Sequence, residues 1–188
     1  SLAADAEMDC LAIQLVEAFR MMKTEVPNLR LDIIGMRADH FDRPIPSDVY
    51  VHGYLDKAVD VQRALYYELL QDAQVFVNTN PRWSAFSATV EAMYHYLPVV
   101  VTPYDEFVRI FSDDIPFGRY CARNEPTAIL EELRKVLFAA DYASMCQQAH
   151  DAVKGFTWDA YMGKLVETVD GSGLAGSDGS VETGVRNT

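Results

Sequence analysis

One short segment carries the side chains best suited to binding a ligand, the stretch PRWSAFSATVEAMYHYLPVVVTP at residues 81–103. Its apolar spacing predicts a helix with hydroxyl side chains at its start and one carboxylate, Glu91, within it. Unpaired backbone N–H groups and the helix dipole at such a start favour a phosphate, and the hydroxyls of Ser84, Ser87 and Thr89 would add to this cradle. Helix capping explains the same hydroxyl residues equally well, and a surface position explains a lone glutamate.

Three larger side chains accompany this segment. Trp83 could stack on a sugar or a base, although a loop aromatic more often packs against the protein. His52 and His95 are the histidines nearest the expected ligand site, but acid–base chemistry needs an orienting partner, and the sequence identifies none for either. A packing role is therefore the simpler interpretation of all three.

An alternation of helices and short apolar strands must position these residues. Helices are expected at residues 6–27, 57–72, 86–96, 105–112, 126–138, 141–153 and 158–168, and strands at 29–35, 48–55, 73–79, 97–102 and 117–121. Continuous Val and Ile strands between helices indicate a parallel sheet covered on both faces. We therefore predict an α/β fold with a doubly wound parallel sheet of the Rossmann-like kind.

In such a sheet, ligands bind outside the carboxyl ends of the strands. Gly35 and Gly53 close two of the strands, the loop 78–87 follows another, and Thr102 ends the next. We therefore expect a crevice at this edge, with Gly53 beside the ligand.

Five segments in this order resemble the C-terminal, nucleotide-sugar-binding half of the group-1 retaining glycosyltransferases of the GT-B fold. They are LDIIG, VHGYL, YYELLQDAQVFVNTN, FSATVEAMYHYLPVVVTP and FTWDAY, and the resemblance spans residues 5–168. In that family, two glutamates separated by seven residues precede Ala-Met and Pro-Val, and the second glutamate holds the ribose hydroxyls of the nucleotide. The match of EAM and LPVV implies this role for Glu91, whose two carboxylate oxygens suit a diol. The implied donor substrate is a nucleoside-diphosphate sugar, such as a UDP- or GDP-sugar.

The sequence also departs from the family. Trp83 stands in the place of the first glutamate, so the two-glutamate motif is degenerate, and Tyr96 stands where a glycine is usual. The arginine and lysine that neutralise the diphosphate are missing, and Arg37 could replace part of their charge, although a salt-bridged surface role is commoner. Glu106 falls where the family often has an acid near the donor sugar, a place that the dipole of the following helix would also favour for an acid.

Composition restricts the partners. The 188-residue chain carries a net charge of −12, which disfavours nucleic acid, and no apolar run is long enough to cross a membrane. Its three cysteines lie far apart and are expected to be reduced, and no Asp-x-Asp or histidine cluster suggests a metal; we expect no cofactor. Because the first residues do not form a signal peptide, we expect a cytoplasmic chain, with peripheral association at the inner face of a membrane left open, or a fragment of a longer one.

The expected organisation is one domain over residues 1–169 and a flexible Gly/Ser-rich tail over residues 170–188. One hypothesis is a donor-binding domain of a hexosyltransferase that is incomplete alone and needs a second GT-B domain or a partner chain for the acceptor. The catalytic residues are then unknown. The alternative is a non-catalytic glycosyltransferase-like module that acts as a partner or scaffold. A third hypothesis, another nucleotide-binding α/β domain such as half of a sugar-nucleotide epimerase, has less support.

Overall fold

The computed structural model describes residues 2–79 and 86–156, with side chains from residue 12 onward. Contacts along the chain separate two compact units, Ser1–Val153 and Lys154–Thr188. Only the first three residues of the second unit are described. All the helices and strands given below belong to the first unit.

Two expectations fall on the second unit beyond its described residues. The helix expected at residues 158–168 lies there, and so does the boundary expected between a domain ending at residue 169 and a tail. The division after Val153 reflects how contacts group along the chain, and it does not locate the start of a tail. The extent of the domain and of the tail therefore stays a prediction.

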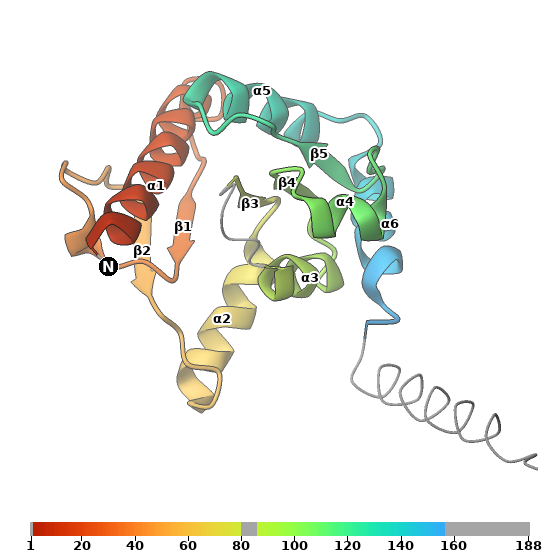
Figure 1. Cartoon of the computed structure of the whole chain (residues 1–188), viewed down its shortest axis with the longest axis horizontal. Coiled ribbons are helices and arrows are strands. Elements are labelled where there is room, and N and C mark those ends of the chain that lie inside the picture. The colour runs from red at the N-terminus through yellow and green to blue at the C-terminus, as the bar shows by residue number, and fades with distance from the viewer. Residues whose placement is uncertain (1, 80–85, 157–188) are drawn as a thin grey trace, which may run out of the picture. The chain divides into compact units, whose positions relative to one another are not determined.

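Helices and strands follow one another along the first unit in the order that the sequence predicts (Figure 1). The helices are α1 (Leu2–Lys23), α2 (Asp60–Asp72), α3 (Phe86–Tyr94), α4 (Asp105–Phe111), α5 (Pro126–Leu137) and α6 (Tyr142–Val153), and the strands are β1 (Leu31–Ile34), β2 (Val49–Gly53), β3 (Phe76–Asn78), β4 (Val99–Val101) and β5 (Gly118–Tyr120). Each strand is shorter than its apolar run, and one short 3-10 helix, η1 (Ala38–His40), lies in a segment expected to be a loop. α2 begins three residues later than expected, at Asp60, which leaves Lys57 in the loop before it.

All strand pairs in the described part of the chain are parallel, which confirms the α/β class. β1 pairs with β2, and β3, β4 and β5 pair in that order. One continuous ladder was expected, whereas the described strands form a two-stranded and a three-stranded sheet. Ile34 of β1 and Phe76 of β3 nevertheless pack against the same apolar cluster, so the two sheets share an interior.

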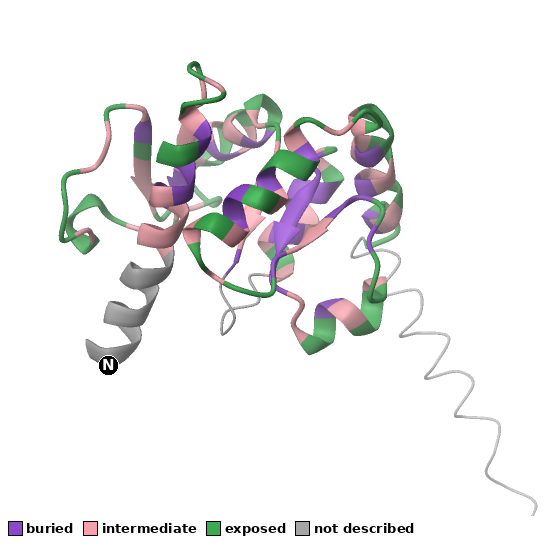
Figure 2. Cartoon of the chain, turned by 90° about the horizontal axis from the view of Figure 1, so that it is seen from above, coloured by how far each residue is buried: buried purple, intermediate pink, exposed green. Residues whose placement is uncertain are grey.

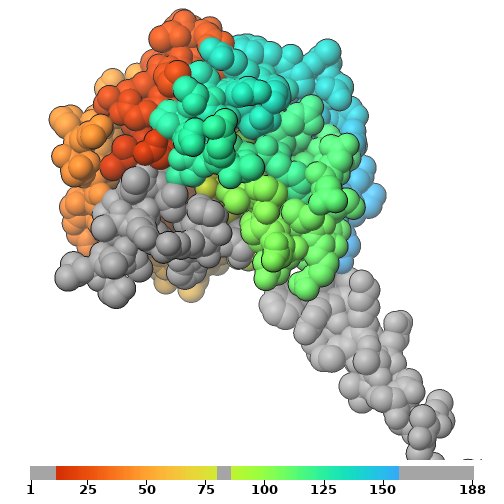
Figure 3. Space-filling model, turned by 45° about the horizontal axis from the view of Figure 1, so that its top comes forward, coloured from red at the N-terminus to blue at the C-terminus, as the bar shows by residue number. Residues whose placement is uncertain are grey.

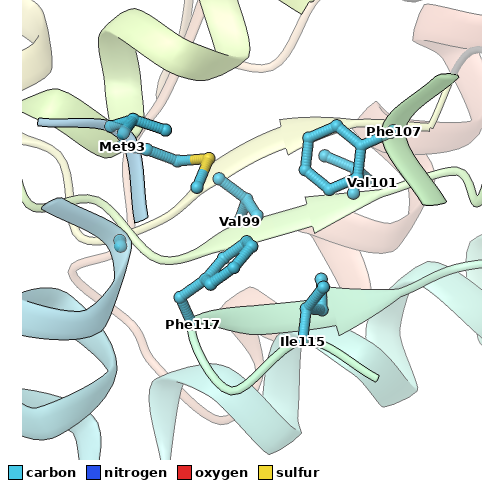
Figure 4. Packing of buried hydrophobic residues seen from close by; sticks show 8 residues of the cluster. Met93, Val99, Val101, Phe107, Ile115 and Phe117 are labelled. Atoms are coloured by element: carbon cyan, nitrogen blue, oxygen red, sulfur yellow. The ribbon is translucent and has the colours of Figure 1, made fainter. Parts of the chain in front are cut away.

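The central strand β4 shows that both faces of its sheet are covered. Val99 and Val101 pack against Phe107 and the neighbouring side chains of α3 and α4 (Figure 4). Val100 points the opposite way, into a cluster with Ile129 of α5 and residues of α1 and α6. Successive side chains of a strand face opposite sides, so a fully apolar strand buried on both faces gives the doubly wound arrangement (Figure 2).

Helix α1 joins two parts of the first unit. Val16 and Phe19 pack on Ile33 and Val49 of the two-stranded sheet, while Ala18 packs with the α5 cluster. α1 and α5 therefore lie side by side at the surface (Figure 3). The helix positions β1 and β2 relative to the other three strands.

The C-terminus of α3 is closed by Tyr96 in the left-handed conformation, with φ of 63°. The N–H of Leu97 donates to the carbonyl of Ala92, and the N–H of Tyr96 donates to that of Met93, which is the Schellman pattern usually built with glycine. The Tyr96 ring stacks on His150 of α6, with centroids 4.2 Å apart and planes 3° apart. This contact offsets part of the cost of a positive φ in a residue with a side chain.

Candidate donor site

The carboxyl ends of β1 and β2 are turned by two glycines. Gly35 and Gly53 have φ of +92° and +71°, and the N–H of Gly35 donates to the carbonyl of Gly53 at 2.7 Å. A Cβ added to Gly53 would have room, since its nearest contact is the carbonyl of Met36 at 3.9 Å. The backbone conformation therefore selects glycine, because L-residues avoid this region. Both residues lie at the predicted edge of the sheet.

The same edge of the three-stranded sheet holds a polar contact that sequence reasoning missed. Thr79, directly after β3, is buried and donates its Oγ1 hydrogen to Oδ1 of Asn124, in the segment after β5, at 2.6 Å. Thr102, directly after β4, is also buried, and its N–H donates to the carbonyl of Asn78. Their positions just past strand ends were a usable signal, but the partner of Thr79 lies 45 residues away in sequence.

Glu91 is the centre of a three-residue contact made by separate elements. Its Oε1 atom accepts from Nζ of Lys57 at 2.5 Å, and its Oε2 atom accepts from the hydroxyl of Tyr66 at 2.7 Å. Lys57 lies between β2 and α2, Tyr66 lies on α2, and Glu91 lies on α3. Sequence reasoning found Glu91 and missed its two partners. The position of Lys57 four residues after Gly53 was a signal for it, whereas Tyr66 sits within a helix with no motif.

The surroundings of Tyr66 favour the protonated form of its phenol. Burial raises the pKa of the Tyr66 phenol, and the hydrogen bond to the Glu91 carboxylate raises it further. The ammonium of Lys57 lies 4.9 Å from the centre of the Tyr66 ring, so it meets both a carboxylate and an aromatic face. The Glu91 side chain remains 31% exposed.

The hydroxyl residues of the predicted phosphate cradle differ in their exposure. Ser87 is exposed in the first turn of α3 and lies four residues before Glu91, so the two share one face of the helix. Thr89 is fully buried, so its side chain belongs to the packing of α3. Ser84 and Trp83 lie outside the described residues.

Arg37 and Glu106 occupy exposed positions. Arg37 forms an ion pair with Asp39, through Nε at 3.1 Å and a terminal nitrogen at 2.7 Å, and its side chain is 70% exposed. The pairing is the surface role that is commoner for an arginine. Glu106 lies in the first turn of α4, where its charge complements the helix dipole. A donor contact by either residue stays a prediction.

His52 has an orienting partner that the sequence did not reveal. Its Nε2 atom lies 2.7 Å from Oδ1 of Asp32 on the neighbouring strand, and the same oxygen accepts from Arg30 at 2.7 Å. Both His52 and Asp32 are largely buried, with side chains 16% and 24% exposed. His95 instead packs against the ring of Tyr67, with centroids 5.3 Å apart.

The described residues bear on metal and membrane binding in two ways. Within residues 12–79 and 86–156, no group of three or more His, Cys, Asp or Glu side chains is placed to hold a metal ion. None of the described helices is both long and apolar enough to cross a membrane. Independence from metals and cofactors stays a prediction.

Comparison with known families gives one match over most of the chain. A family model described as "Glycosyl transferases group 1" matches residues 12–138, which include Gly53, Lys57, Tyr66 and Glu91. No curated protein matches the chain.

A solved structure has the same fold. The pneumococcal O-GlcNAc transferase GtfA, crystallised in complex with UDP and GlcNAc, superposes with a TM-score of 0.67 at 15% sequence identity. The match covers 87% of this chain and 33% of that chain, so the present chain corresponds to about a third of the transferase. The likeness confirms the parallel, Rossmann-like α/β fold.

Proposed function

The chain belongs to the group 1 glycosyl transferases, and from this premise we propose that it forms the donor-binding domain of a retaining glycosyltransferase. The ligand is the nucleotide part of a nucleoside-diphosphate sugar, and the site is the carboxyl edge of the sheets around Glu91. Transfer to an acceptor requires a second domain or partner chain, which the proposal also includes. We also propose, as the sequence predicts, that the protein is cytoplasmic and that donor binding needs no metal.

The position of Glu91 carries this proposal. The Glu91 side chain is partly exposed, lies on the helix after β3, and contacts Lys57 in the loop that follows Gly53. The carboxyl edge of a parallel sheet is where open α/β folds bind nucleotides. An ionised carboxylate accepts hydrogen bonds only, so it suits the two adjacent hydroxyls of a ribose.

The start of α3 supplies the complementary part for the phosphates. The first N–H groups of a helix have no partner within the helix, and the dipole favours negative charge there. Ser87 lies in this first turn, on the same face as Glu91. At a rise of about 1.5 Å per residue, four residues span about 6 Å, a distance that a ribose and its first phosphate can bridge.

Calorimetric titration with UDP, GDP and ADP tests the proposal. We expect one nucleoside diphosphate to bind, and Glu91→Ala to weaken its binding by about 1–3 kcal/mol, the scale of a lost hydrogen bond to a charged group. Glu68→Ala on α2 is the matched control, since Glu68 is an exposed helical glutamate, and it should leave the affinity unchanged. A folded chain that binds none of the three would contradict the proposal.

One observation favours a second candidate, the non-catalytic partner module. Both oxygens of Glu91 already accept hydrogen bonds from protein side chains, so the carboxylate has a structural role without any ligand. On this hypothesis Glu91→Ala lowers stability, because Tyr66 is left buried without its acceptor, and nucleotides do not bind. The same titration, with a thermal melt of each variant, separates the two candidates.

A further inference from the structure

We propose that Lys57 and Tyr66 are positioning residues that orient the Glu91 carboxylate so that it selects a ligand with two adjacent hydroxyls. This inference rests on the proposed function and names the feature of the nucleotide that the site recognises. A ribonucleotide carries that diol, and a 2′-deoxyribonucleotide lacks it.

The hydrogen bonds at Glu91 leave capacity for a ligand. A carboxylate offers about four lone-pair positions, two on each oxygen. Lys57 occupies one position on Oε1, and Tyr66 occupies one on Oε2. Among the contacts of the described residues, one position on each oxygen is therefore left, and the Glu91 side chain is 31% exposed. Two acceptors on adjacent oxygens match two adjacent hydroxyl donors.

Tyr66 gives the carboxylate a fixed support. Its side chain is only 7% exposed and packs with Leu70, Ala92 and Leu97 between α2 and α3. The ring also meets Tyr67 edge to face, with centroids 5.5 Å apart. Packing on this scale holds the ring in one rotamer, so the hydroxyl meets Oε2 from a constant direction.

Lys57 is restrained at both ends of its side chain. Its backbone carbonyl accepts a hydrogen bond from Arg63 at 3.0 Å, which ties the loop to the first turn of α2. Its ammonium lies against the Tyr66 ring and on Oε1 of Glu91. A free carboxylate rotates about its last bond, whereas two donors on different oxygens fix its plane.

Two substitutions separate the orientation of the Glu91 carboxylate from its charge. Tyr66→Phe keeps the ring and its packing but removes the hydroxyl, so Oε2 loses its support. Lys57→Met keeps the length of the side chain and removes the ammonium. In either variant the carboxylate remains and still accepts single hydrogen bonds, but the paired contact with a diol is weakened.

The test first finds which of UDP, GDP and ADP binds, and then compares the affinities of that nucleoside diphosphate and its 2′-deoxy form for the full chain and its variants by calorimetry. For the unmodified chain we expect the ribonucleotide to bind about tenfold more tightly than its 2′-deoxy form, since a lost hydrogen bond to a charged group has about that effect. Tyr66→Phe and Lys57→Met should reduce this preference to less than about threefold, and Lys57→Arg should restore most of it. Tyr67→Phe, the neighbouring substitution on α2, should leave the preference unchanged.

The outcomes distinguish this inference from the proposed function. If one of the three nucleotides binds and both variants keep its full preference over the 2′-deoxy form, the positioning role is overturned while the donor site stands. If the folded, unmodified chain does not bind UDP, GDP or ADP, both proposals are overturned. Lys57 is 42% exposed, so Lys57→Met should fold and decides the matter even if Tyr66→Phe does not.

Discussion

The imidazole Nε2 of His52 lies 2.7 Å from the carboxylate Oδ1 of Asp32, and this contact links the neighbouring strands β1 and β2. Arg30 donates to the same oxygen and lies over the ring of Tyr50, 4.3 Å from its centre. The histidine thus has an orienting carboxylate, as an acid–base residue would need. Because that carboxylate is shared with an arginine directly before its own strand, the arrangement supports the pairing of the strands.

We therefore predict that His52 and Asp32 are coupled in stability and not in nucleotide binding. A double-mutant cycle of His52→Ala and Asp32→Ala should give a coupling free energy of about 1 kcal/mol in urea unfolding. The affinity for the nucleotide that binds should change less than about twofold in either variant. A large loss of affinity without a loss of stability would instead assign His52 to the ligand site.

Gly118 is predicted to be required by packing. A Cβ at this position would clash with the backbone carbonyl of Val99 on the neighbouring strand β4. Gly118→Ala should lower the free energy of unfolding by about 1–3 kcal/mol, the usual cost of overpacking. Gly155→Ala is the control, because a Cβ there meets no atom within 4 Å. Equal stability of the two variants would show that β4 and β5 can separate without cost.

At Tyr96, a glycine substitution is predicted to be less destabilising than an alanine substitution. Its φ of 63° suits glycine, and an alanine there keeps the backbone strain while losing the stacking on His150. Tyr96→Gly should therefore be more stable than Tyr96→Ala by about 1 kcal/mol in chemical unfolding. An alanine variant as stable as the glycine variant would mean that the turn after α3 has changed conformation.

Buried and partly buried tyrosines predict a loss of stability at alkaline pH. Burial raises the pKa of Tyr104 and of Tyr120 to about 12, and it raises that of Tyr66 together with the hydrogen bond to Glu91. An unfolded tyrosine ionises near pH 10, so above that pH the unfolded state binds fewer protons than the folded state. The free energy of unfolding should therefore fall as pH rises from about 10 towards about 12.

Tyr66→Phe isolates one of these groups. Above about pH 11 its slope of stability against pH should be shallower than that of the unmodified chain by about 1.4 kcal/mol per pH unit, the value for one proton. At pH 7 the two slopes should agree, since a phenol is then protonated in both states. Parallel slopes throughout the alkaline range would show that Tyr66 ionises in the folded protein as easily as in the unfolded one.

The order of elements was predictable because it is encoded locally. The continuous run of Val99 to Val101 between two helical segments indicates a buried parallel strand, and the structure buries all three residues on both faces of a sheet. Pro126 marks the start of α5 in the same local way. The ends of elements were less predictable, because Tyr96 leaves the helix through a left-handed turn that a tyrosine does not signal.

The site was predictable only where a single segment carries it. Glu91 and Ser87 could be recognised together because they are four residues apart on one helix. Lys57 lies 34 residues from Glu91, and Asp32 lies 20 residues from His52, so both contacts depend on how elements pack. Local periodicity contains no information on such pairs.

Hydrogen–deuterium exchange with and without saturating UDP, GDP or ADP tests whether a nucleotide binds between the start of α3 and the loop after Gly53. The first amides of α3 lack partners within the helix and should exchange quickly in the unliganded chain. We expect the nucleotide that binds to slow exchange in residues 53–57 and 86–91, and Glu91→Ala to reduce this protection while α6 is unaffected. Protection confined to other elements, or none at a nucleotide concentration that saturates binding, would contradict it.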